Sequence, residues 1–335
     1  MSGLPFPDRQ ARQRGLTLVE LMISIVLGML VVLAATALLV SSKSSYIAQD
    51  DGTQMQDTAR FALENINRSL RQAGFENWGT IDSATKNEIS APIVMVPTME
   101  ANLVGLDARR LKEDTGTPGI DNPQTSDVVN GSDVLAVRFF GVSKPGSTDA
   151  DESIVDCAGN GVSAPASQNT ADEDRGWSIY YVAKDAAGVP ELRCKYRNDA
   201  GSTWGYGAIA RGVESFQVLY GVDTDGDRIA NQFMTATQIK ALDAGPPVRT
   251  NIDTYWKKVT AVKVALLLRG AQARQAEPVE TTYHLFGPDY TDANGSNDAG
   301  ASIAESSLPA ETRRRSRKVY MATIQFRNQP EGSGS

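Results

Sequence analysis

The chain has 335 residues, of which 41% are hydrophobic and 22% are charged, and its formal net charge is −7. This length leaves room for one large or two small folded domains. The acidic balance argues against a general nucleic-acid binder, and two cysteines without a Cys-x-x-Cys pair argue against a zinc or thioredoxin-like site.

Residues 1–15 read as a short leader that carries Arg9, Arg12 and Arg14 against Asp8. The leader has a net charge of +2, so the chain without it carries −9. By the positive-inside rule, these arginines place the amino terminus on the cytoplasmic side of a membrane. The part of the chain beyond the membrane is therefore expected on the opposite side.

A nearly unbroken apolar stretch follows over residues 16–40. It is long enough to cross a hydrocarbon core as a helix, which needs about 20 residues. Its single ionisable residue is Glu20, and a carboxylate near the end of such a helix costs about 2 to 3 kcal/mol on insertion scales. The stretch exceeds the apolar run of about 7 to 15 residues in a signal peptide. A plain membrane anchor would leave Glu20 unexplained.

The residues at the start of this stretch resemble those of type IV prepilins. That family has a short basic leader ending in Gly, then an apolar residue, then T-L-x-E and a long apolar helix. Gly15, Leu16, Thr17, Leu18 and Glu20 occupy these positions. The resemblance implies that a prepilin peptidase cleaves after Gly15 and that the new amino terminus, Leu16, is N-methylated. Leu16 departs mildly from the family, in which Phe or Met is commoner.

The resemblance also implies a role for Glu20. In the family, the acid at this position pairs with the terminal amine of a neighbouring subunit, so Glu20 would pair with the amine of a neighbour's Leu16. Two opposite charges close together in a low dielectric offset the desolvation that each suffers alone. We therefore expect Glu20 to act in subunit assembly.

Beyond the apolar stretch, the helix is predicted to continue over residues 41–74 with an amphipathic character. Apolar residues recur three and four apart and predict a stripe that faces a core, at Met55, Ala59, Ala62, Leu63, Ile66, Leu70 and Ala73. Gly74 stands where a helix C-cap belongs. Residues 71–75 resemble the R-x-A-G-[FY] helix end of PilW-like minor pilins and PulJ-like pseudopilins, although an ordinary amphipathic helix with a glycine stop would look similar.

Residues 75–335 are predicted to form a β-rich head. We expect loops with short strands over 77–132 and a long acidic loop over 143–176. Strands are predicted at 133–140, 177–182, 192–196, 213–220, 258–268 and 319–326. Consecutive strands with few helices between them favour an antiparallel sheet. The predicted fold class is α+β, with a long N-terminal helix that is transmembrane in its first half and carries an antiparallel β-sheet head.

Two cysteines lie in the predicted head. Cys157 is in the acidic loop and Cys194 is in a predicted strand. An oxidising periplasm favours a disulfide between them, and two buried free thiols are the alternative.

An acidic motif occupies residues 223–231. Asp223, Asp225 and Asp227 alternate, so three carboxylates can turn toward one point, as a hard cation such as Ca²⁺ requires. The motif resembles the first half of an EF-hand and the D-x-D-G-D calcium repeats of secreted proteins. It departs from the EF-hand at Gly226, which comes one position early, and at Met234, which replaces the bidentate Glu.

A calcium site here would need further ligands. The carbonyl of Ile229, the side chain of Asn231 or a distant acid would have to complete it. The alternative is an acidic hairpin turn, in which Asp-Gly is also a favoured pair.

Three other signals are weak. The segments 159–164 and 205–210 match G-x-G-x-x-A outside a strand-to-helix context and are predicted to be loops. His284 is the only histidine and has no G-x-S-x-G partner, so it is predicted to be a strand residue. The basic run 313–318 is predicted to be a solvated lead-in to the last strand, because the head around it is acidic; nucleic acid is not an expected partner.

The pattern and the resemblance predict a structural assembly protein and not an enzyme. A PilW-like minor pilin would wait in the inner membrane with a periplasmic head, prime fibre assembly with other minor pilins, and end at or near the pilus tip. The implied partners are other minor pilins, the major pilin and the prepilin peptidase, with a tip adhesin as a further candidate. The alternatives are a type II secretion pseudopilin, and an adhesin or DNA-capturing minor pilin.

Overall fold

The computed structural model describes residues 15, 17–75, 94–198, 203–273 and 280–326. The chain divides into two compact units, residues 1–50 and residues 51–335. The first unit holds the N-terminal part of helix α1 (Leu18–Gln72), which is the one helix among these described residues that is long and apolar enough to cross a membrane. Its large apolar side chains between Leu18 and Val40 are exposed, as in a helix that requires lipid or neighbouring helices.

The second unit contains the remaining turns of α1, and these carry the predicted apolar stripe. Its buried members are Met55, Ala59, Ala62, Ile66, Leu70 and Ala73, and Leu63 is partly buried. The helix ends at Gln72, and Gly74 follows with a φ of 75°. A left-handed glycine at this position is a common helix C-cap, so the stripe and its end agree with the sequence.

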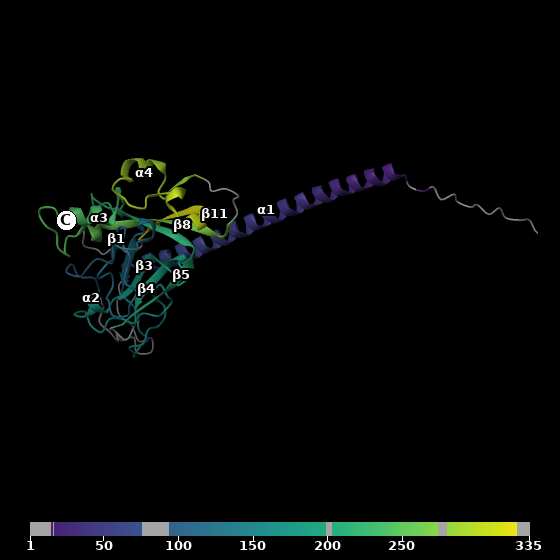
Figure 1. The fold of residues 1–335 in the computed structure, drawn as a ribbon. Coiled ribbons are helices and arrows are strands. Elements are labelled where there is room, and N and C mark those ends of the chain that lie inside the picture. The colour runs from purple at the N-terminus through teal and green to yellow at the C-terminus, as the bar shows by residue number, and fades with distance from the viewer. Residues whose placement is uncertain (1–14, 16, 76–93, 199–202, 274–279, 327–335) are drawn as a thin grey trace, which may run out of the picture. The chain divides into compact units, whose positions relative to one another are not determined.

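Two antiparallel sheets form the body of this unit (Figure 1). The five-stranded sheet has the order β1-β2-β3-β4-β5, the four-stranded sheet has the order β11-β8-β6-β7, and β9 and β10 form a separate ribbon. The strands are β1 (Leu103–Leu106), β2 (Val134–Phe139), β3 (Gly176–Lys184), β4 (Pro190–Arg197), β5 (Trp204–Arg211), β6 (Val213–Val222), β7 (Gln232–Met234), β8 (Val259–Ala273), β9 (Thr282–His284), β10 (Ser302–Ala304) and β11 (Arg315–Gln325). This arrangement confirms the predicted α+β class, and His284 lies in a strand as expected.

Short helices connect these strands. They are α2 (Ala171–Asp174), α3 (Ala236–Ala244) and α4 (Pro288–Asn294), with 3₁₀ turns at Val129–Gly131, Tyr255–Lys258, Glu305–Ser307 and Ala310–Thr312. Thr235 caps α3 in a capping box with Gln238. Asp107 adds two acceptors at the same helix end, for the backbone N–H groups of Ala236 and Thr237.

The main hydrophobic core packs the stripe of α1 against inward side chains of both sheets. Strand β2 shows the alternation that this requires. Leu135 and Val137 belong to the main core, whereas Val134 and Ala136 belong to a second cluster on the other face of the sheet. A third cluster packs β8 against the β9–β10 ribbon.

Strand β5 corrects the prediction that residues 205–210 form a loop. Its glycines and alanines have a low strand propensity, which is why the sequence did not indicate a strand. Pairing with β4 along its length overrides that propensity.

Candidate assembly site and structural sites of the head

The first turn of α1 closes on itself through Thr17 and Glu20. The backbone N–H and the hydroxyl of Thr17 both donate to Oε2 of Glu20 at 3.0 Å. The backbone N–H of Glu20 donates to the hydroxyl of Thr17 at 3.2 Å. This reciprocal pair is a capping box, and it satisfies N–H groups that a helix start otherwise leaves without partners. The carboxylate of Glu20 therefore faces the N-terminal end of its own helix.

The capping box places a negative charge where the helix dipole is positive, and the side chain of Glu20 stays exposed there. Leu16 and residues 1–14 lie outside the described residues, while Gly15 is exposed. Cleavage after Gly15, methylation of Leu16 and the intersubunit pairing of Glu20 thus stay predictions. The capping role of Thr17 was missed, although the T-x-x-E spacing indicates it.

The head contains the disulfide that the sequence predicted. Cys157 and Cys194 are bonded with a Cα–Cα distance of 6.0 Å, and both are buried. Cys194 lies on β4, and Cys157 lies in the long loop between β2 and β3. The bond therefore fixes this loop to the five-stranded sheet.

A buried hydroxyl fixes α1 to the same sheet. The Tyr180 hydroxyl on β3 lies 2.7 Å from the Ser69 hydroxyl and 2.7 Å from Oδ1 of Asn65, both on α1. Burial raises the pKa of Tyr180, so the hydroxyl stays protonated. Asn65 also donates from Nδ2 to the backbone oxygen of Cys157 at 3.1 Å. Helix, sheet and disulfide loop thus meet at one polar cluster, which hydrophobic periodicity gives no means to predict.

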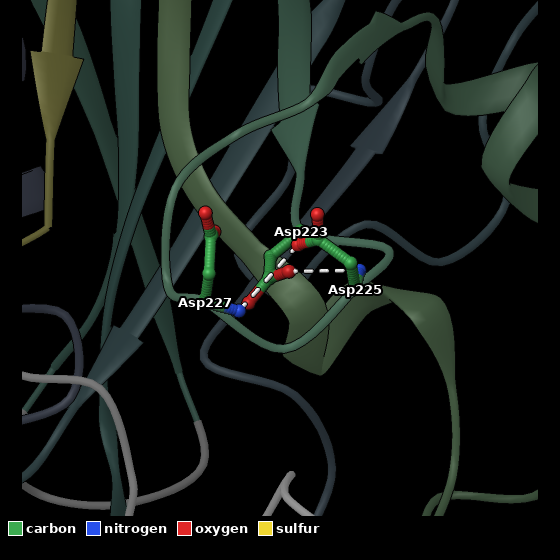
Figure 2. A group of neighbouring side chains, drawn as sticks. All are labelled: Asp223, Asp225 and Asp227. Carbon is green, nitrogen blue, oxygen red and sulfur yellow. Dashed lines mark hydrogen bonds between the residues drawn. The ribbon is translucent and has the colours of Figure 1, made fainter.

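The acidic motif forms the connection between β6 and β7. Asp223, Asp225 and Asp227 each offer one carboxylate oxygen, and these atoms lie within 4.8 Å of one another (Figure 2). Asp223 is buried and the other two are exposed. The structure thus brings together the three carboxylates that the spacing pointed to.

Asp223 organises this loop through hydrogen bonds. Its carboxylate accepts from the backbone N–H groups of Asp225, Gly226 and Arg228. Burial favours the neutral acid, but these hydrogen bonds outweigh it and lower the pKa of Asp223. The loop is therefore held by its own carboxylates, a role that an acidic turn and a cation site share.

The two further ligands that the sequence suggested lie in the same loop. Asn231 uses its side-chain oxygen to accept from the backbone N–H of Thr224 at 2.8 Å, and its Nδ2 donates to Asp225 at 3.0 Å. Ile229 donates its backbone N–H to Asp227. Carboxylate and carbonyl oxygens are the donors that Ca²⁺ takes, so the chemistry fits that ion, and binding stays a prediction.

The basic run 313–318 is less solvated than predicted. The side chain of Arg317 is fully buried and forms ion pairs with Glu214 on β6 and with Glu305. Arg313 donates to the backbone oxygen of Leu308, and Arg315 donates to that of Ala271. Much of the run therefore stabilises the four-stranded sheet and the β9–β10 ribbon.

Known families match the chain at both ends. The Prokaryotic N-terminal methylation motif matches residues 10–36, and the family Type IV Pilus-assembly protein W (PilW) matches residues 179–328. Among solved structures, the Type IV-like pilin TTHA1219 from Thermus thermophilus is 15% identical, with 59% of this chain and 80% of that chain covered and a TM-score of 0.29. No curated protein matches the chain.

The methylation motif, which includes Gly15, Leu16 and Glu20, and the long helix with its antiparallel head define a type IV pilin-like protein. Within that class the chain is PilW-like, because the PilW family matches the segment from β3 through β11. The resemblance found in the sequence is thereby confirmed.

Proposed function

We propose that this protein is a minor type IV pilin, which primes fibre assembly in a complex with other minor pilins and lies at or near the fibre tip. The observation that carries the proposal is the presence of the methylation motif and the PilW domain on one chain. The head supports a tip position, because two sheets and a ribbon are well beyond what α1 needs for packing. The role is structural, and we assign no catalytic residue.

The proposed sequence of events begins at the leader. A prepilin peptidase cleaves after Gly15, Leu16 becomes the methylated amino terminus, and the apolar half of α1 holds the protein in the inner membrane. During assembly, Glu20 pairs with the amine of a neighbour's Leu16. Small residues such as Gly28 and Ala34 allow close approach of neighbouring apolar helices.

The test is mass spectrometry of the mature amino terminus of the protein from sheared surface pili. We expect a chain that starts at N-methylated Leu16. A chain that retains residues 1–15 would contradict processing as a pilin. Presence in the envelope alone, with secretion lost on deletion, would instead indicate a type II secretion pseudopilin.

A further inference from the structure

A groove of about 470 Å³ lies between strand β5 and helix α1 in the second unit. Phe61 and Arg68 line it from α1, and Gly207 and Ile209 line it from β5. The disulfide and the loop beside it also line the groove. This β5–α1 groove therefore has a helix along one side and a strand along the other (both labelled in Figure 1).

Strand β5 is an edge of the five-stranded sheet. Within the described residues it pairs with β4 on one side, and the outward backbone groups of residues 205–211 have no hydrogen-bond partner. Such an edge is a template for a further strand. In peptide recognition by strand addition, main-chain hydrogen bonds to such an edge give affinity, and adjoining pockets that bind alternate side chains give specificity.

The local sequence keeps this edge accessible. Gly207 pairs with Cys194, and a Cβ added at Gly207 would meet no atom within 4 Å. At Gly207, therefore, no side chain stands in the way of an incoming backbone.

The lining of the groove offers apolar surface and carries no net charge. Phe61 is 59% exposed and offers an aromatic surface, and Ile209 adds an aliphatic one. Glu64 and Arg68 stand one helical turn apart and have opposite signs, so they leave no net charge along the helix side. Small or apolar side chains on an extended backbone are the best match to this combination.

We propose that an extended, uncharged peptide segment of another pilin subunit adds as a strand to β5 and places its side chains in the β5–α1 groove. The partner class rests on the proposed function. Five residues of β5, Tyr206–Ala210, offer about 17 Å of edge to such a strand.

Site-specific photocross-linking tests contact with the groove. The full chain, in cells that assemble pili, carries benzoylphenylalanine at Ala208 or, as the control, at the exposed Thr323 of β11, a second edge strand. With the cross-linker at position 208, we expect a product with a non-helical segment of another pilin. With the cross-linker at position 323, we expect no such product. Cross-links to a second copy of this chain, to a helical segment or to lipid, or no cross-link at 208, would overturn the proposal.

A blocking variant tests whether assembly needs the groove. Gly207→Trp fills it, Gly207→Ser adds little bulk, and Thr323→Trp places the same ring on the other edge. We expect Gly207→Trp to be cleaved and to form its disulfide but to be lost from sheared pili, while the two controls enter as the unmodified chain does. Normal entry of Gly207→Trp refutes strand addition at β5. Absence of the unmodified chain from pili refutes the proposed function instead.

Discussion

Glu20 combines a capping role with a proposed pairing role, and one substitution separates them. Gln retains an acceptor for Thr17, because capping boxes take Gln as well as Glu, but it has no charge. We therefore expect Glu20→Gln to insert and to be cleaved, and yet to be lost from the fibre. Immunoblots of sheared pili against the cell envelope measure this loss.

The matched control for that experiment is Thr17→Ala. It removes the cap at a cost of about 1 kcal/mol but keeps the carboxylate of Glu20, so the variant should still enter the fibre. Normal incorporation of Glu20→Gln would show that the charge is not needed.

The acidic loop between β6 and β7 should make the stability of the protein depend on calcium. Adding Ca²⁺ at millimolar concentration should raise the melting temperature of the detergent-solubilised protein, since extracellular sites bind at about 10⁻⁴ to 10⁻³ M. Asp225→Asn should remove this gain and change the melting temperature without calcium little, because Asn keeps an acceptor for Asn231. A melting curve of the unmodified protein that does not respond to Ca²⁺ would contradict the metal site.

Among the elements, β11 depends on a buried ion pair. Arg317 of this strand neutralises Glu214 of β6 and Glu305 beyond β10, and all three side chains are almost fully buried. Arg317→Met should lower the free energy of unfolding by about 3 kcal/mol, because Glu305 would lose its buried cation and Glu214 would keep only Arg269, which lies 3.2 Å from its Oε1. Denaturant unfolding measures the change.

Arg314 provides the comparison for Arg317. It is exposed and three residues away, so Arg314→Ala should change the free energy of unfolding by about 0.5 kcal/mol or less. Equal effects of the two substitutions would contradict the structural role of the ion pair.

The same elements show what the sequence could and could not predict. The α1 stripe and strands such as β2 and β8 were predictable, because burial on one face imposes a period and because central strands are rich in β-branched residues. Strand β5 was missed, because its glycines and alanines have a low strand propensity and show no alternation of apolar and polar residues. The burial of Arg317 was missed because its partners Glu214 and Glu305 are distant in sequence.

The candidate sites divide in the same way. Local spacing predicted the clustering of Asp223, Asp225 and Asp227, because neighbouring residues of one turn converge without help from the rest of the fold. The contact of Tyr180 with α1 depends on how strand β3 packs against a helix that lies more than 100 residues earlier in the chain. No local pattern carries that information.

At the scale of the whole molecule, buried acids link stability to pH. Burial, with a contribution from Asp107, raises the pKa of Asp298 from 3.8 to about 6. The folded protein thus keeps this proton up to about pH 6, whereas the unfolded chain releases it near pH 4. The contribution of Asp298 to stability is therefore lost as the pH rises from about 4 to about 6.

Asp298→Asn tests this linkage. The neutral amide still accepts from the Tyr290 hydroxyl, which lies 2.7 Å from Oδ2 of Asp298, but it does not ionise. The variant should gain stability relative to the unmodified protein as the pH rises from 4 to 7, measured as the difference in denaturant midpoint at each pH. A difference that stays constant over this interval would contradict the raised pKa.

The polar cluster of Asn65, Ser69 and Tyr180 has a mechanical consequence. Tension that runs along α1 must shear this cluster before the helix can slide over β3, and Asn65 passes part of the force to a loop closed by the covalent bond of Cys157. If the protein enters a fibre as proposed, a pull on α1 would therefore be passed to the head through hydrogen bonds to β3 and to a disulfide-closed loop.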